Sequence, residues 1–273
     1  MDRPSSWYAP AVIRGDNVMA SVFVERSGPV GPRFFLKLAI AMAVVIFVGF
    51  SLQWVMGRST FAVPVAVHVH ALLFFGWTVL FVVQTAFAGR ADRKLHRRLG
   101  WIGGGWASAV VIVGVYTTAM MVRRGGAPFF FTPAYFLFMN ALFVTGFGGL
   151  VAAAIRLRRR TEWHRRLMIC AMAILTGPAF GRILPLPLMI PWAAWGVFAA
   201  VLLFPAAGML ADLRRRGRVH AAWWWGTGTI TAIQLAIGIV AASPPGLALY
   251  HLVMRGGGAE AVAPDVYPPF PPL

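Results

Sequence analysis

The chain has 273 residues, of which 59% are hydrophobic, and its mean hydropathy is +0.72. Soluble domains carry roughly 45–50% apolar residues, so this composition excludes an ordinary soluble domain and indicates an integral membrane protein. The formal net charge of +17 does not predict a nucleic-acid partner, because the basic residues sit at the ends of apolar segments, where anionic lipid headgroups attract them.

The apolar residues gather in seven segments, which are predicted to be transmembrane helices at about 20 residues per crossing. In chain order they span 34–56, 62–88, 99–121, 133–155, 163–184, 191–210 and 221–242. Each is apolar on all sides rather than at alternate positions, which excludes the strands of a transmembrane β-barrel. The predicted fold is therefore an all-α, polytopic transmembrane helical bundle of about seven helices.

Three regions follow from composition and loop length. Residues 1–32 are polar and run into the first apolar segment without a small-residue cleavage site, which predicts a cytoplasmic segment ahead of an uncleaved signal anchor. The loops within 33–243 are short, so this stretch is predicted to be one transmembrane domain. The Pro/Gly-rich tail, 244–273, is expected to be extracytoplasmic, and extended and poorly ordered after Arg255.

Basic residues gather in the loops after the second, fourth and sixth segments, and the positive-inside rule places such loops in the cytoplasm. These residues are Arg90, Arg93, Lys94, Arg97 and Arg98; Arg156, Arg158, Arg159, Arg160, Arg165 and Arg166; and Arg214, Arg215, Arg216 and Arg218. The N-terminus is therefore predicted inside and the C-terminus outside. The predicted partner of these residues is a lipid bilayer with anionic headgroups.

A histidine follows each basic loop, close to the start of the next apolar segment: His96, His164 and His220. His96 and His164 have the same predicted depth, and two arginines follow each of them. Two imidazoles that face each other across a bundle can ligate haem iron axially while arginines neutralise the propionates. His96 and His164 are therefore candidate ligands of a haem b; the alternative is that they anchor the helices at headgroup level.

His70, about a third of the way into the second segment, is a third candidate haem ligand. It heads a stripe of residues spaced three or four apart: Phe74, Trp77, Phe81 and Gln84. Such a face could line a flat cofactor or a quinone. The alternative is helix packing, with His70 and Gln84 bonded across to residues such as Asn140 or Gln234.

Arg182 is a cation near the outer end of the fifth segment, at about the level of His70 and Asn140. Polar groups at membrane depth commonly mark ligand sites. Arg182, Asn140 and Gln84 are therefore candidate residues for binding an anionic or carbonyl-bearing molecule. The alternative is an arginine that snorkels to the interface.

Other classes of site find no support in the sequence. His68 and His70 point to nearly opposite sides of a helix, and no His-Glu-x-x-His or Cys-x-x-Cys motif occurs, so no metal-ion site is predicted. The eight carboxylates lie in tails, loops or helix ends, which disfavours an intramembrane proton relay. No nucleophile, base and orienting group can be assigned, so no catalytic residue is predicted and an enzyme is not expected.

Two motifs carry a resemblance to other proteins: His96-Arg97-Arg98-Leu99-Gly100 and His164-Arg165-Arg166-Leu167-Met168. With Gln84 upstream and Arg182 ending the second helix, they resemble a group of uncharacterised bacterial multi-helix membrane proteins. More distantly, the chain is similar to predicted membrane proteins of unknown function with HRxxG and HRxWM motifs, although Leu167 stands where those have Trp. The resemblance covers roughly 64–184 and implies a multi-pass protein of the bacterial inner membrane.

Three functional hypotheses follow. The first is an electron-transfer protein linked to a b-type haem or a quinone, which would use His70, His96 or His164. The second is a non-enzymatic binder of a lipid or small molecule, and the third is an accessory subunit whose partner is a larger membrane complex.

Overall fold

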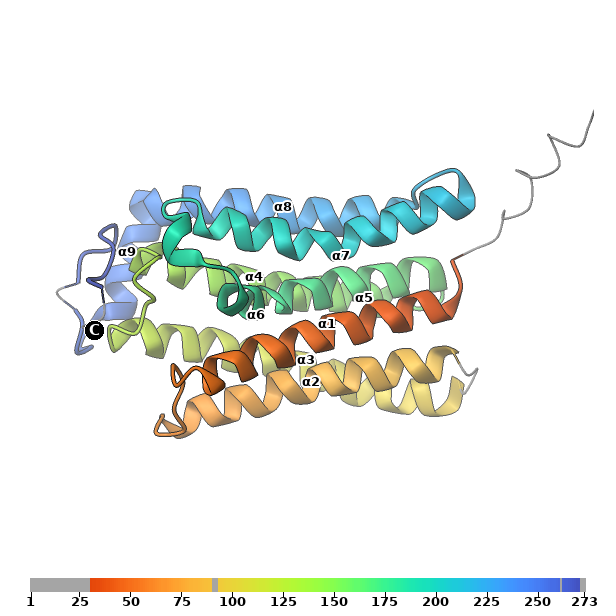
Figure 1. Cartoon of the computed structure of the whole chain (residues 1–273), viewed down its shortest axis with the longest axis horizontal. Helices are drawn as coiled ribbons and strands as arrows, with labels where there is room; N and C mark the ends of the chain where they lie inside the picture. The colour runs from red at the N-terminus through yellow and green to blue at the C-terminus, as the bar shows by residue number, and fades with distance from the viewer. Residues whose placement is uncertain (1–29, 90–92, 261, 271–273) are drawn as a thin grey trace, which may run out of the picture.

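A computed structural model describes residues 30–89, 93–260 and 262–270, and this part of the chain is a helical bundle without β-strands (Figure 1). Its elements are α1 (Pro32–Val55), α2 (Val65–Gly89), α3 (Arg93–Arg123), α4 (Pro133–Arg156), α5 (Thr161–Leu175), α6 (Gly177–Ile183), the short 3-10 helix η2 (Leu186–Met189), α7 (Ala193–Arg216), α8 (Ala221–Ala242) and α9 (Pro244–Met254). The predicted cytoplasmic segment 1–32 lies outside the described residues except at 30–32.

Six of these helices are long and apolar enough to cross a membrane: α1, α2, α3, α4, α7 and α8. With α5 and α6 taken together as one bent crossing, they correspond to the seven predicted segments. The all-α bundle is thereby confirmed, and the chain has the character of a multi-pass membrane protein. Helix α3 begins six residues before its apolar segment and α7 ends six residues after it, because arginine and lysine are good helix formers and extend each helix beyond the apolar part.

The fifth predicted crossing is broken where its proline lies. Helix α5 ends at Leu175, α6 begins at Gly177, and the two are bent by 42°. Pro178 has no N–H and its ring clashes with a preceding helical turn, so it is tolerated in the first turn of a new helix and not inside a continuous one. The break thus lies at Pro178, whereas α7 continues through Pro205.

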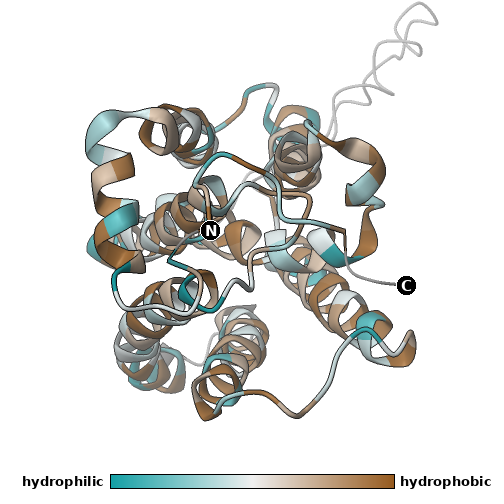
Figure 2. Cartoon of the chain, turned by 90° about the vertical axis from the view of Figure 1, so that its left-hand side faces the viewer, coloured by the Kyte–Doolittle hydropathy of each residue, from teal (hydrophilic) through white to brown (hydrophobic). Residues whose placement is uncertain are grey.

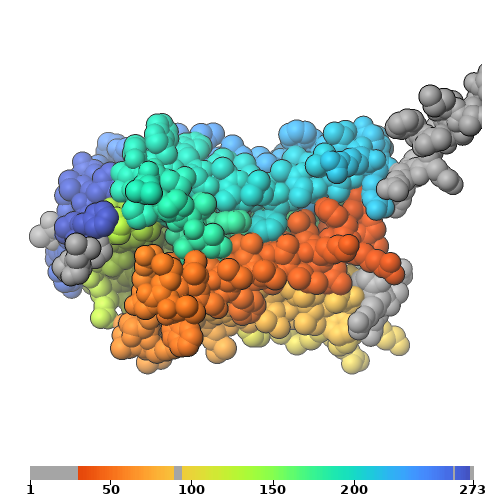
Figure 3. Space-filling model, in the orientation of Figure 1, coloured from red at the N-terminus to blue at the C-terminus, as the bar shows by residue number. Residues whose placement is uncertain are grey.

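Helix α5 is the central element of the bundle. Its residues from Ile169 to Leu175 are all buried, and it packs against α4, α8, α7 and α1. The remaining helices surround it, with α2 and α3 joined to it through α4 and α1 (Figure 2). Figure 3 shows one outer face, with α1 and α2 in its lower half and residues 177–216 in its upper half.

The bundle has two distinct ends. The end of α2, the start of α3 and the α4–α5 and α7–α8 connections lie together at what we call the arginine-rich end, as the alternation of the helices predicts (Figure 1). The opposite end, which we call the tail end, carries α9 and residues 255–270.

The described part of the tail begins with a helix, α9, ahead of the segment predicted to be extended, and then lies against the bundle. Helix α9 begins after Ser243, whose hydroxyl accepts a hydrogen bond from the Gly246 N–H at 3.1 Å and so caps the helix. Farther on, the Ala259 N–H donates to the Arg123 carbonyl at 3.1 Å, and the Ala134 N–H donates to the Pro264 carbonyl at 3.0 Å. Main-chain hydrogen bonds therefore hold the tail against the ends of α3 and α4, which proline content alone could not reveal.

Candidate functional site

Two of the predicted haem ligands meet at the arginine-rich end. His96 is the fourth residue of α3, and His164 is the fourth residue of α5. Their ring centroids are 6.3 Å apart and their planes are nearly perpendicular, at 88°. Because α3 and α5 each pack against α4, the two imidazoles approach each other beside the end of α4.

Main-chain carbonyls fix both imidazoles. His164 Nδ1 lies 2.9 Å from the Ala154 carbonyl, near the end of α4, and His96 Nδ1 lies 3.2 Å from the Gln84 carbonyl in α2. A carbonyl can only accept a hydrogen bond, so each Nδ1 carries a proton, and in the neutral form of each ring it is Nε2 that has the lone pair. Histidines that ligate metals are held in the same way, through the nitrogen that does not bind the metal.

Gln84 was predicted to bind a ligand together with Arg182 and Asn140, but it contacts the histidine pair. Its Nε2 donates to the His96 carbonyl at 3.2 Å, so α2 holds the first turn of α3 through both the side chain and the main chain of one residue. The packing alternative, in which Gln84 bonds to Asn140 or Gln234, is absent: Asn140 donates to the Phe136 carbonyl of its own helix, and Gln234 donates to Tyr135.

The outer candidates do not form one polar site. Arg182 lies over the Phe50 ring at 4.0 Å and donates to the Pro178 carbonyl at 2.8 Å. His70 stacks on Phe74 with 4.1 Å between ring centroids, and its buried Nδ1 has no hydrogen bond within the described residues. Asn140 is bonded within α4. Arg182 and His70 are thus each engaged with an aromatic ring, and the charge of Arg182 acts on His70, but no hydrogen bond joins these three residues within the described part of the chain.

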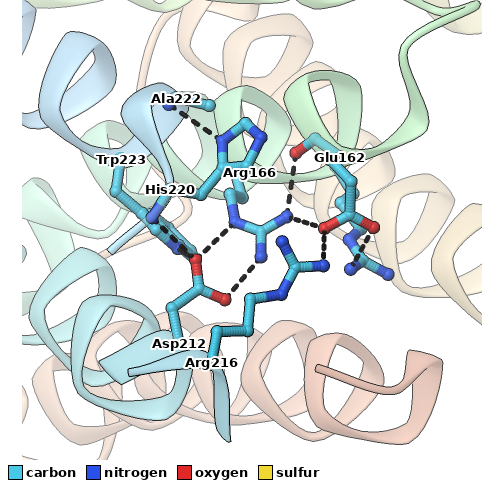
Figure 4. A network of polar contacts seen from close by, with 8 residues as sticks. Glu162, Arg166, Asp212, Arg216, His220, Ala222 and Trp223 are labelled. Carbon is cyan, nitrogen blue, oxygen red and sulfur yellow. Dashed lines mark hydrogen bonds and ion pairs between the residues drawn. The ribbon is translucent and has the colours of Figure 1, made fainter. Parts of the chain in front are cut away.

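A buried ion-pair network, which sequence reasoning missed, lies beside the histidine pair (Figure 4). The Arg166 and Asp212 side chains are 0% and 1% exposed. Arg166 binds Asp212 in a bidentate manner, with Nε–Oδ2 and Nη2–Oδ1 distances of 2.9 and 2.5 Å. The Trp223 indole N–H donates to Asp212 Oδ2 at 3.0 Å. This cluster ties α5, α7 and α8 together in the core.

Glu162 extends the network toward the surface. Its carboxylate contacts Arg165 at 2.5 Å, Arg166 at 2.6 Å and Arg216 at 2.6 Å. Two signals in the sequence point to it. Arg165 and Arg166 follow Glu162 at three and four residues, the spacing of helical ion pairs. Asp212 lies near the C-terminus of α7, where the helix dipole disfavours a carboxylate unless a cation holds it.

His220, the third histidine that follows a basic loop, has a different role. It precedes α8, and its Nδ1 accepts a hydrogen bond from the Ala222 N–H at 3.1 Å. Burial, followed by repulsion from the Arg166 guanidinium, holds the pKa of His220 below its usual value despite the attraction of Glu162 and Asp212. The ring is therefore neutral at pH 7, with its proton on Nε2.

The described residues contain no group of three or more His, Cys, Asp and Glu side chains arranged to hold a metal ion. A metal at the histidine pair would thus take its other ligands from a cofactor. Comparison of the chain with protein-family models, curated proteins and solved structures finds no match. The resemblance through the two His-Arg-Arg-Leu motifs accordingly stays a prediction, and the argument about function depends on the geometry of the site.

Proposed function

We propose that this protein is a membrane electron-transfer protein that binds a b-type haem with His96 and His164 as its axial ligands. The observation that carries the proposal is the pairing of two imidazoles from α3 and α5, each with its Nδ1 on a main-chain carbonyl. Such anchoring directs the Nε2 lone pairs to a metal.

The donor set fits haem in number and spacing. Two imidazoles on one metal atom have ring centres about 6 Å apart, because each metal–nitrogen bond is about 2.0 Å; the observed separation is 6.3 Å. His96 and His164 would hold the iron of a haem through their Nε2 atoms, and the macrocycle would supply the remaining ligands. His70 lies in the first half of α2, whereas Gln84, which contacts His96, lies near the end of that helix. His70 is stacked on Phe74, and we do not assign it to this centre.

The surroundings of the pair suit the same cofactor. Arg97 and Arg98 are exposed next to His96, where guanidinium groups can pair with propionates. When bound, a haem with both axial positions filled by protein supplies one-electron transfer. We also propose that the arginine-rich end faces the cytoplasm of a bacterial inner membrane, because short basic loops are retained on that side.

The haem content of purified variants tests this proposal. We expect about one haem per chain in the wild type, measured as the pyridine complex after purification in detergent from cells supplied with a haem precursor. His96→Ala and His164→Ala should each retain less than half of it, because each removes one of the two iron ligands. The control is His68→Ala, which removes an exposed histidine and should keep the wild-type content. A wild type without haem would contradict the proposal.

A further inference from the structure

A hollow of about 310 Å³ opens at the arginine-rich end, between the start of α5 and the α7–α8 loop. Trp163, Arg216, Arg218, Val219, His220 and Ala221 line it. One water occupies about 30 Å³, so the hollow has room for a phosphate group. It is separate from the histidine pair, since neither His96 nor His164 is in its lining.

The lining offers hydrogen-bond donors and positive charge. His220 presents an Nε2–H, because its Nδ1 accepts from Ala222. Arg216 is held by Glu162 through one nitrogen, Nη2, so its remaining N–H groups are free to donate. Ala221 opens α8, so the positive end of the helix dipole lies here, while the Ala222 and Trp223 N–H groups already donate to His220.

Arg218 is the part of the lining that is free to meet a ligand. Its side chain is exposed, and the described residues supply it with neither a hydrogen bond nor an ion pair. The two nearby carboxylates are already engaged, Asp212 by Arg166 and Glu162 by three arginines. No carboxylate lines the hollow; Arg216 is paired with Glu162, so Arg218 supplies its uncompensated positive charge.

From this arrangement we infer that the hollow binds the phosphate of an anionic phospholipid, with Arg218, Arg216 and the His220 Nε2–H as its donors. A basic pocket between the ends of membrane helices lies where headgroups are found, and such pockets recognise anionic lipids. Trp163 meets His220 edge to face at 5.6 Å, and tryptophan is enriched at this depth of a bilayer. The inference does not depend on haem binding.

Arg215, in the last turn of α7, and Arg218, in the α7–α8 loop, provide a matched test. Arg215 is exposed, as Arg218 is, but it does not line the hollow. We expect the full-length wild type in detergent to bind phosphatidylglycerol more tightly than phosphatidylcholine in native mass spectrometry. Arg218→Gln should weaken phosphatidylglycerol binding about five-fold, since each arginine near the membrane surface contributes about 1 kcal/mol. Arg215→Gln, with the same loss of charge, should leave it unchanged.

Equal weakening by the two substitutions would overturn the inference, because it would mean that overall charge and not the hollow attracts the lipid. Equal binding of the two lipids by the wild type would overturn it as well. Inorganic phosphate serves as a competitor in the same experiment. Displacement of phosphatidylglycerol by inorganic phosphate would assign the hollow to the phosphate group itself, and failure to displace it would assign the hollow to the intact headgroup.

Discussion

Replacing Asp212 with asparagine is expected to lower the free energy of unfolding by about 3–5 kcal/mol, the range for removing one partner of a buried ion pair. The substitution keeps the shape of the side chain and an oxygen that can accept from the Trp223 indole N–H. It removes the carboxylate that accepts from Nε and Nη2 of Arg166, whose side chain is 0% exposed. The loss therefore reflects a buried cation that keeps only the partly exposed Glu162 as its counter-ion among the described residues.

Unfolding by sodium dodecyl sulfate in mixed micelles measures this free energy. The Arg166→Met, Asp212→Asn double variant should recover more than half of the lost stability, because it removes the stranded charge while Glu162 keeps Arg165 and Arg216. Asp265→Asn alters an exposed carboxylate and should change stability by no more than about 0.5 kcal/mol. If Asp212→Asn behaved like Asp265→Asn, the network would not hold the bundle together.

The second large effect is expected where α8 crosses α5. Gly226 is buried, and a Cβ added to it would lie 2.7 Å from the Cys170 Cβ, with the Cys170 sulfur closer still. Cys170 is fully buried in the core, so neither helix can yield without moving its neighbours. Gly226→Ala should therefore destabilise the protein by about 1–3 kcal/mol, the usual cost of overpacking a filled core.

Gly228 is the control for this substitution. It lies two residues farther along α8, and a Cβ there would have no heavy atom within 4 Å. Gly228→Ala should be neutral or stabilise the protein by up to about 1 kcal/mol, because alanine is the better helix former. Both variants can be measured by the same unfolding titration. Equal effects of the two substitutions would mean that α8 does not approach α5 as closely as the structure shows.

Hydropathy predicts most of this fold because the bilayer requires long apolar helices that satisfy their own hydrogen bonds. The sequence also predicts the break at Pro178, since proline disrupts the helix in which it lies. Hydropathy does not predict helix α9, because its 11 residues are too few to cross a membrane. The position of Ala259 and Pro264 against α3 and α4 depends on contacts between distant segments, which no local pattern encodes.

The candidate site is partly predictable for the same reason. Spacing places His96 and His164 at one depth, and their arginine neighbours mark the end of the bundle at which they lie. Their meeting beside α4 depends on helix packing, as does the pairing of Arg166 with Asp212, 46 residues away. Ligand binding by Arg182, Asn140 and Gln84 stays a prediction; of the three, Gln84 lies at the histidine pair and Asn140 donates within α4. Sequence can give depth along a helix, but the rotation of one helix against another is set by tertiary contacts.

Electron paramagnetic resonance of the oxidised, purified protein tests most directly whether His96 and His164 bind one iron. The account predicts a low-spin ferric haem signal in the wild type, because two imidazoles fill both axial positions. His96→Ala and His164→Ala should each shift the haem that remains to a high-spin signal, and the double variant should lose haem. Absence of haem from the wild type, or an unchanged low-spin signal in both single variants, would contradict the proposed centre.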